Sequence, residues 1–182
     1  MAGPRVVQGG ADSLFCMDVD EQIMATVVTV SDEIHAGNDA NRSGPLALEL
    51  LAPHGIQAEL VVVPDDQERI ASAVVAAISS GARIVLTCGG TGIGPGDVTV
   101  DAVTPLLAYQ VPGICEEVRR RGSIHVASAL VSREVAGVGL EAPAPVFVMT
   151  APGSRGGVRD AIDVVGPLLA YIVAQLDGGG HF

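Results

Sequence analysis

Aromatic residues are scarce in this chain of 182 residues, which has no tryptophan, three phenylalanines and two tyrosines. This scarcity excludes a core built around large rings, although 48% of the residues are apolar. The interior must therefore be built from valine, alanine, leucine and isoleucine. A core of that composition is typical of α/β proteins, whose parallel strands are buried on both faces.

Cationic residues are also few in this chain. The chain has no lysine, and its 10 cationic residues stand against 21 Asp and Glu, which gives a formal net charge of −11. A surface that follows the phosphates of a nucleic acid polymer is therefore excluded. A small anionic ligand is compatible with this balance if backbone N–H groups and a cation offset the repulsion.

Cysteines and long apolar runs are few. Cys16, Cys88 and Cys115 form no C-x-x-C pair, so the sequence predicts neither a disulfide framework nor a zinc site, and instead buried thiols in a reducing cytoplasm. No apolar run reaches membrane-spanning length, and the first residues lack the basic start and apolar segment of a signal peptide. We expect a soluble, cytoplasmic protein with no membrane partner.

The length suits one hydrophobic core, because two cores in 182 residues would each be small. Residues 1–22 show little periodicity and predict an N-terminal tail with little structure. A regular pattern covers residues 23–178, which form the predicted single domain. Residues 179–182 then make a short C-terminal tail.

Strand-like and helix-like segments alternate along this domain. Runs rich in β-branched residues predict strands at 23–30, 58–63, 83–87 and 145–150. Apolar periodicity predicts helices at 45–55, 67–81 and 158–176, and a broken helix near 105–121. The alternation predicts an α/β fold, a three-layer α/β/α sandwich with a mostly parallel central sheet.

Ligands of such sheets bind outside the carboxyl ends of the strands. The polar loops at those ends are residues 31–45, 64–68, 88–99 and 151–157. Because parallel strands end at one edge of the sheet, we expect the four loops to converge on one rim.

The loop "CGGTGIGPGDVT" (88–99) combines five glycines with one acid. Glycine allows positive φ and lets a ligand approach backbone N–H groups, which suits phosphate. A Walker loop is excluded because it needs lysine, and the G-x-G-x-x-G fingerprint is interrupted by Pro95 and Asp97. Two interpretations remain: a tight strand-to-helix turn, and a phosphate cradle in which Asp97 holds Mg²⁺. An Asx-turn is the alternative role for that carboxylate.

Two acids follow the second predicted strand. Asp65 with Glu68 fits a capping box at the start of the next helix, and Asp66 is an alternative cap. Because one cap is enough, one acid is left to face the rim. Ser31 and Asp32 have the same two interpretations, a turn or cap and a ligand contact.

The cationic residues offer few candidates for an anion site. Arg119, Arg120 and Arg121 form the densest cluster, and their place before Gly122 favours a solvated helix end. Contact of one of them with an anionic substrate is the alternative. The pair Ser132-Arg133 is open between a structural role and phosphate binding.

The glycine loop and its neighbours together resemble a known family. "TCGGTGIGPGDVT" (87–99) resembles the G-G-T-G-x-x-x-x-D-x-T signature of the MoaB/Mog molybdenum cofactor biosynthesis proteins, the molybdopterin adenylyltransferases. Further motifs follow in family order between Thr26 and Leu176: "VSDEIHAG" (30–37), "RSGP" (42–45), "VVPDD" (62–66), "VPGICEEVR" (111–119), "LVSR" (130–133) and "APGSRGGVRDAI" (151–162).

This resemblance implies transfer of AMP from ATP to the terminal phosphate of molybdopterin, with release of pyrophosphate. It implies that Asp65 and Asp97 are the catalytic acids and share Mg²⁺, the cofactor, with substrate phosphates. ATP is then a co-substrate. The implied substrate and phosphate contacts are Ser31, Asp32, Gly89, Gly90, Thr91, Gly92, Thr99, Pro152, Gly153 and Ser154.

The same resemblance implies a homotrimer, with a downstream molybdate-insertion enzyme as a further partner. A non-catalytic molybdopterin-binding protein of the same fold is the alternative function. The presence of both Asp65 and Asp97 favours catalysis, because a passive anion binder gains little from acids beside its ligand.

Four positions depart from the family pattern. Asn41 stands where many relatives have an acid, whose role then passes to Asp39 or is lost. Val100 and Arg155 stand where proline is common. Pro105 interrupts an expected helix, which we predict to start late or to kink.

Overall fold

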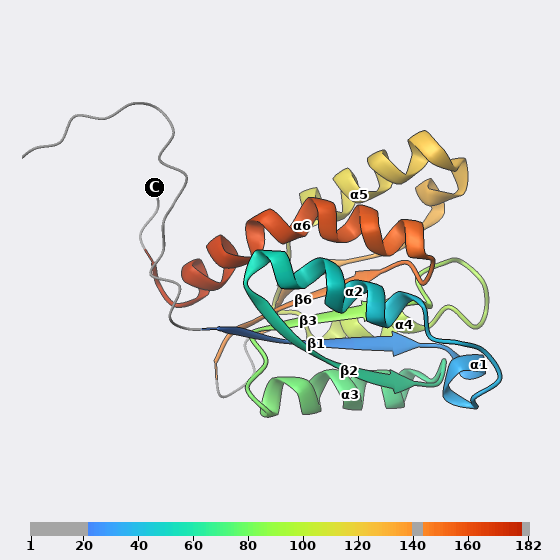
Figure 1. The fold of residues 1–182 in the computed structure, drawn as a ribbon, viewed down its shortest axis with the longest axis horizontal. Helices are drawn as coiled ribbons and strands as arrows, with labels where there is room; N and C mark the ends of the chain where they lie inside the picture. Colours follow the sequence, from blue (N-terminus) through green and yellow to red (C-terminus); the bar gives the residue numbers. More distant parts are fainter. Residues whose placement is uncertain (1–21, 140–143, 180–182) are drawn as a thin grey trace, which may run out of the picture.

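Four parallel strands form the centre of the fold in the computed structural model, which describes residues 22–139 and 144–179. In spatial order they are β2 (Ile56–Val63), β1 (Ile23–Val30), β3 (Ile84–Cys88) and β6 (Val146–Ala151) (Figure 1). β3 and β6 are buried along their whole length because both faces of the sheet are covered, as their aliphatic runs predict. The four predicted strands are confirmed, with small shifts at their ends.

A short mixed edge completes the sheet. β5 (Ala136–Gly139) pairs antiparallel with β6, and β4 (Tyr109–Gln110) pairs antiparallel with β5, which gives the order β2-β1-β3-β6-β5-β4. The sequence analysis did not predict these two strands, because β4 has only 2 residues and β5 consists of Ala, Gly and Val. The prediction of a mostly parallel sheet is confirmed, with β5 as the antiparallel strand.

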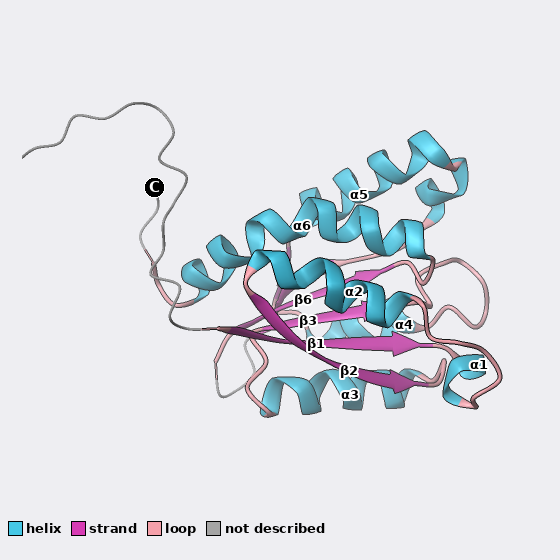
Figure 2. Cartoon of the chain, in the orientation of Figure 1, coloured by secondary structure: helices cyan, strands magenta, loops and turns pink. Residues whose placement is uncertain are grey.

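Helices on both faces make the three layers (Figures 1 and 2). The helices α2 (Ser43–Leu51), α5 (Pro112–His125) and α6 (Arg155–Leu176) pack on one face, and α3 (Gln67–Ser79) and α4 (Thr99–Val103) pack on the other. Each face has its own core of buried aliphatic side chains, among them Leu51 and Ile162 on the first and Ile70 and Val85 on the second. The predicted α/β/α sandwich is confirmed.

Short elements complete the described secondary structure: α1 (Asp32–His35) and the 3₁₀ turns η1 (Ala52–His54), η2 (Thr104–Leu106) and η3 (Ala127–Val131). Pro105 lies in η2, directly after α4. The proline therefore ends this helix and does not delay its start at Thr99, which corrects the expected late start. A new helix, α5, begins at Pro112, so the predicted break near 105–121 is confirmed.

The last helix begins earlier than its apolar periodicity predicts. Its cap is Ser154, whose Oγ accepts a hydrogen bond from Gly157 N–H at 3.1 Å. Arg155, which stands where proline is common in the family, occupies the first helical position, where no intrahelical partner for the N–H is available in any case. The departure at Arg155 therefore leaves the helix start intact.

Two of the three cysteines lie within the described residues. Cys88 and Cys115 are buried and free, as predicted, and burial raises the pKa of each thiol to about 12. Cys16 and the predicted tails, apart from residues 22 and 179, lie outside the described residues. Among the helices that the structure describes, none combines the length and apolarity needed to cross a membrane.

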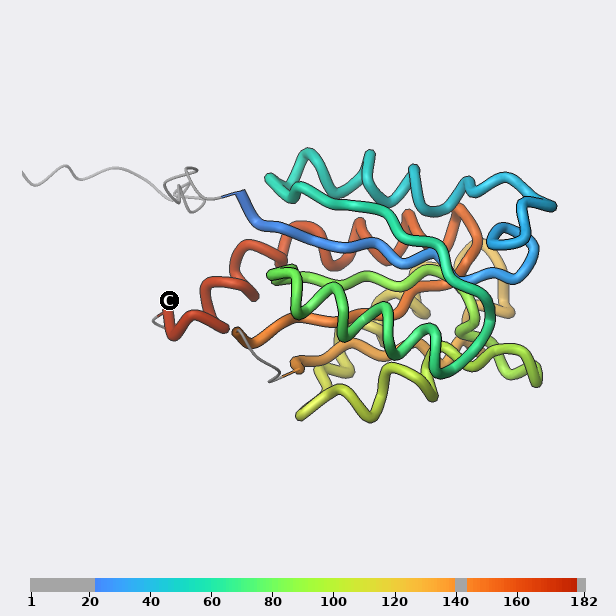
Figure 3. Tube along the Cα trace, turned by 90° about the horizontal axis from the view of Figure 1, so that it is seen from below, coloured from blue at the N-terminus to red at the C-terminus, as the bar shows by residue number. Residues whose placement is uncertain are grey.

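The carboxyl ends of the parallel strands meet at one end of the molecule (Figure 3). The loops that lead into α1 and α3, the glycine loop and the turn before α6 all leave the sheet there. Segments far apart in the sequence are thereby brought to one edge, as the α/β alternation predicts.

Gly44 and Gly113 allow a matched test of the packing between helix and sheet. Both are the second residue of a helix, but a β carbon on Gly44 would lie 2.6 Å from Leu60 Cδ1 and 2.6 Å from Thr29 Oγ1, whereas one on Gly113 would meet nothing within 4 Å. We predict that Gly44→Ala lowers the free energy of unfolding by about 1–3 kcal/mol through overpacking. Gly113→Ala leaves it unchanged or raises it by up to about 1 kcal/mol. Urea denaturation measures both, and equal effects would contradict the packing described.

Candidate functional site

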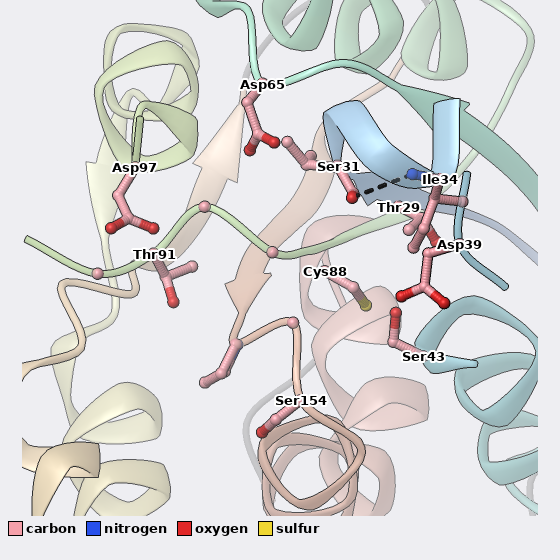
Figure 4. Close-up of a pocket in the computed structure, with 16 residues that line it drawn as sticks. Thr29, Ser31, Ile34, Asp39, Ser43, Asp65, Cys88, Thr91, Asp97 and Ser154 are labelled. Carbon is pink, nitrogen blue, oxygen red and sulfur yellow. Dashed lines mark hydrogen bonds between the residues drawn. The ribbon is translucent and has the colours of Figure 1, made fainter. Parts of the chain in front are cut away.

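A cleft of about 550 Å³ opens at the carboxyl ends of β1, β3 and β6 (Figure 4). Its lining comes from all four loops expected to converge, so that prediction is confirmed. The predicted site residues that line it are Ser31, Asp65, Gly89, Gly90, Thr91, Gly92, Asp97, Pro152, Gly153 and Ser154. The remaining lining residues are Thr29, Val30, Ile34, Asp39, Ser43 and Cys88.

Asp32 and Thr99 were predicted as site residues but do not line the cleft. Asp32 instead pairs with Asp65 through two hydrogen bonds: Asp32 N–H donates to Asp65 Oδ2 at 2.9 Å, and Asp65 N–H donates to Asp32 Oδ1 at 3.0 Å. Thr99 is fully buried beneath the glycine loop, and its N–H donates to Gly90 O at 3.1 Å. Asp32 therefore holds the lining residue Asp65 through hydrogen bonds, and Thr99 packs against Gly90 of the lining.

The start of the glycine loop has a backbone that only glycine adopts readily. Gly89 and Gly90 have φ values of +117° and +62°. A β carbon on Gly89 would collide with Val30 O at the end of β1, and one on Gly90 would collide with Thr99 Oγ1. The loop is thus a tight turn, and the same bare backbone faces the cleft, so the two interpretations of these glycines are compatible.

Asp97 lies near the end of the glycine loop and forms a turn with Gly94. Its Oδ2 accepts a hydrogen bond from Gly94 N–H at 2.9 Å, and its own N–H donates to Gly94 O at 3.0 Å. The turn role considered for this acid is therefore present. Oδ1 accepts no hydrogen bond from the described residues, and the residue lines the cleft. One carboxylate oxygen thus holds the turn while the other is available to a ligand.

The two acids after β2 have separate roles. Asp66 caps α3, since its Oδ1 accepts from Arg69 N–H at 2.8 Å, and the capping box of Asp65 with Glu68 does not form. Asp65 therefore faces the cleft, where Asp65 Oδ1 lies 3.4 Å from the place that a β carbon on Gly90 would take. The carboxylates of Asp65 and Asp97 both lie beside residues 89–92 of the glycine loop (Figure 4).

Asn41 builds the start of α2. Its Oδ1 accepts from Gly44 N–H at 2.9 Å, and its Nδ2 donates to Thr29 Oγ1 at 3.1 Å. The side chain is thus committed to the helix start. Asp39 lines the cleft two residues earlier, so an acid is present near this turn, as expected if the role passes to Asp39.

The arginine cluster of α5 does not reach the cleft. Arg120 and Arg121 both bind Glu117, with shortest N···O distances of 2.6 Å and 3.0 Å. Hydrogen bonds from these two arginines lower the pKa of Glu117 to about 2. Arg119 Nη1 donates to the carbonyl oxygen of Glu134 at 3.2 Å. These contacts favour the solvated helix end for Arg120 and Arg121, and no arginine lines the cleft within the described residues.

Arg133 holds the glycine loop in place. Its backbone N–H donates to Thr91 O at 2.8 Å, and its guanidinium donates to Gly92 O at 2.7 Å and to Asp97 O. The guanidinium also binds both carboxylate oxygens of Asp101, at 3.2 Å and 3.1 Å, and thereby lowers the pKa of that acid. These contacts give Arg133 a structural role at the glycine loop. Sequence reasoning could not find it, because the contacts join residues far apart in the chain. Phosphate binding by the Ser132-Arg133 pair stays a prediction.

This architecture defines an α/β protein with a cleft at the carboxyl edge of its sheet, the place where open α/β sheets generally bind ligands. Residues 26–171 match the family model described as "Probable molybdopterin binding domain", and the chain belongs to this family. The resemblance that the motifs indicate is therefore confirmed.

Relatives and solved structures agree with this assignment. A "Molybdenum cofactor biosynthesis bifunctional protein" of Chlorobaculum tepidum is 34% identical over 156 residues, which is 85% of this chain and 49% of that protein, so the chain spans about half its length. A "Molybdopterin adenylyltransferase" of Pyrococcus furiosus is 34% identical over 140 residues, or 76% of this chain and 82% of the relative. The solved structure of a molybdopterin biosynthesis protein from Mycobacterium abscessus has 38% identity and a TM-score of 0.79, covering 87% of this chain and 98% of that one.

Replacing Arg133 with lysine tests its role in the loop. Lysine keeps the charge but lacks the planar fork that reaches two carbonyls and a carboxylate together. We predict that Arg133→Lys lowers the free energy of unfolding by about 1–3 kcal/mol. The control Arg120→Lys changes an exposed ion pair on α5 and should have an effect within about 0.5 kcal/mol. Chemical denaturation compares them, and an equally small effect of both changes would contradict the role given to Arg133.

Proposed function

We propose that this chain acts in molybdenum cofactor biosynthesis by transferring AMP from ATP to the terminal phosphate of molybdopterin, with release of pyrophosphate. The observation that carries the proposal is the placement of Asp65, from the loop after β2, beside the glycine loop that carries Asp97 (Figure 4). The similarity to a Pyrococcus furiosus protein named molybdopterin adenylyltransferase supports it.

The proposed reaction needs positioning and charge neutralisation. A terminal phosphate oxygen of molybdopterin attacks the α-phosphorus of ATP, and the bond from that phosphorus to the oxygen that leaves with pyrophosphate breaks. Both reactants are anions, so catalysis rests on holding them in line and offsetting their charge. A covalent step on the protein is not needed. Cys88, the thiol in the lining, is unsuited to one because burial raises its pKa to about 12.

Helix starts and hydroxyl groups supply donors for the phosphates. The N-termini of α2 and α6 lie at the cleft, where Ser43 and Ser154 belong to the lining, and helix N-termini favour anions. The hydroxyl oxygens of Ser31 and Ser154 each accept a backbone N–H, from Ile34 and Gly157. Each hydroxyl proton is then left to donate to a ligand.

Mg²⁺ fits this site only together with a phosphate ligand. Within the described residues no group of three His, Cys, Asp or Glu side chains could hold a metal ion. Mg²⁺ typically binds through one or two carboxylates plus substrate phosphate oxygens, which Asp65 and Asp97 with ATP would provide. When bound, the ion would supply the positive charge that the described cleft lining lacks.

Substitution of the acids tests the proposed reaction. We predict that Asp65→Asn and Asp97→Asn each lower the rate of adenylylated molybdopterin formation from Mg²⁺, ATP and molybdopterin by about a hundredfold or more. Asp66→Asn is the matched control, since Asn caps a helix as well as Asp and the rate should be retained. Pyrophosphate release and product analysis measure the rates.

The outcomes of this assay separate the two functions. Wild-type protein that binds molybdopterin tightly without forming product would favour the non-catalytic binding protein. Full activity in both Asp→Asn variants would leave the reaction standing and refute the roles given to Asp65 and Asp97.

We further propose a homotrimer, with a downstream molybdate-insertion enzyme as the recipient of the product. Large exposed apolar side chains at the end of α5 and in η3 support assembly, since Ile124 is 70% exposed and Leu130 62% exposed. We predict a trimeric mass in sedimentation velocity, and monomers after Leu130→Asp. Val75→Asp, at a position 41% exposed on α3, should leave the trimer intact. A monomeric wild type would refute the assembly.

A further inference from the structure

A buried carboxylate outside the cleft is connected to it by two hydroxyl groups. Glu134 lies between η3 and β5, and only 3% of the residue is exposed. Its Oε2 lies 3.0 Å from Ser132 Oγ, which lies 3.1 Å from Thr91 Oγ1. Thr91 belongs to the glycine loop and to the cleft lining. Two hydrogen bonds in series therefore join Glu134 to the cleft.

The number of available protons fixes the direction of these bonds. A serine hydroxyl has one proton to donate, and an ionised carboxylate has none. When Glu134 is ionised, Ser132 donates to Glu134 Oε2, and Thr91 therefore donates to Ser132 Oγ. The Thr91 oxygen is then left with lone pairs only, so its hydroxyl cannot donate to a phosphate oxygen.

A proton on Glu134 reverses the series. Glu134 Oε1 has no hydrogen-bond partner among the described residues, and the Arg119 guanidinium lies beside it, with Nη1 at 3.7 Å. The proton of neutral Glu134 therefore belongs on Oε2, where Ser132 Oγ accepts it. Ser132 then donates to Thr91, and the Thr91 proton is left for a ligand.

The surroundings of Glu134 shift its protonation equilibrium toward the neutral form. Burial raises its pKa above the ordinary value, and the charge of Asp160 on α6 raises it as well. The hydrogen bond from Ser132 and the charge of Arg119 on α5 act in the opposite direction without cancelling the effect of burial. Cys115 on α5 also faces Glu134, and its pKa of about 12 keeps it neutral.

We propose that Glu134 is a positioning residue that decides whether the Thr91 hydroxyl donates a hydrogen bond to a bound phosphate or accepts one. The proposal rests on the proposed function for the class of ligand, a phosphate held at the glycine loop. Phosphate binding is then tightest when Glu134 is neutral, and binding takes up a proton. Affinity falls as pH rises through the pKa of Glu134.

Glu134→Gln is the sharpest test of this coupling. Its amide oxygen should face Arg119 and its NH₂ should donate to Ser132, as neutral Glu134 does. At low pH we expect the variant and the wild type to bind Mg²⁺-pyrophosphate about equally. At high pH we expect the variant to bind it about tenfold or more tightly, since this is the affinity that one hydrogen bond to a charged acceptor contributes. Pyrophosphate also takes up protons as the pH falls, but it does so equally for both proteins. The ratio of the two affinities therefore cancels this contribution. Titration calorimetry in buffers of different ionisation enthalpy measures the affinity and the proton uptake.

Two controls locate the effect in the hydroxyl series. Ser132→Ala interrupts the hydroxyl series, and Thr91→Val removes the hydroxyl at its cleft end. In either variant, the further substitution Glu134→Gln should no longer change the affinity in a pH-dependent way. An affinity ratio of wild type to Glu134→Gln that stays constant with pH would overturn the proposal.

Infrared spectra of the free protein test the hydroxyl series without any ligand, and so distinguish its failure from failure of the proposed function. The C=O band of neutral Glu134, which Glu134→Gln lacks, should shift in frequency in Ser132→Ala. Absence of phosphate binding to wild type would refute the proposed function, and an unshifted band would refute the hydroxyl series by itself.

Discussion

The site depends on the meeting of three strand ends at Gly89. The N–H of Gly89 donates to Ala151 O at 3.0 Å, and its α carbon lies 3.1 Å from the place that a β carbon on Gly153 would take. Val30 O occupies the place of a side chain on Gly89, and the φ of +117° is one that glycine adopts readily. Because β1, β3 and β6 end in contact, their loops open onto one cleft and residues distant in sequence face the same ligand.

Hydrogen bonds from the protein itself hold the lining of the cleft in place. Arg133 binds the backbone carbonyl oxygens of Thr91, Gly92 and Asp97. Asp32 and Asp65 hold each other through two hydrogen bonds, each from a backbone N–H to the other residue's carboxylate. Groups fixed in this way do not have to reorganise when charge develops in a reaction, which is the basis of electrostatic catalysis. The acidic lining then makes a cation the natural companion of any phosphate ligand.

Much of this could be predicted from the sequence, because runs of β-branched residues and helical periodicity both report burial directly. The parallel strands, the convergence of their loops and the family followed from local signals. The short strands β4 and β5 did not, since Ala, Gly and two-residue segments carry little pattern. The roles of Asp66 and Arg133 required contacts: Asp66 had an equal competitor as cap, and Arg133 acts on residues distant in the chain.

A crystal structure with Mg²⁺ and α,β-methylene ATP tests the proposed use of the cleft most directly. The phosphates should lie along residues 89–92, with the ion between phosphate oxygens and the carboxylate of Asp65, Asp97 or both. A nucleotide bound elsewhere, or phosphates turned away from the glycine loop with no ion at either acid, would contradict this account.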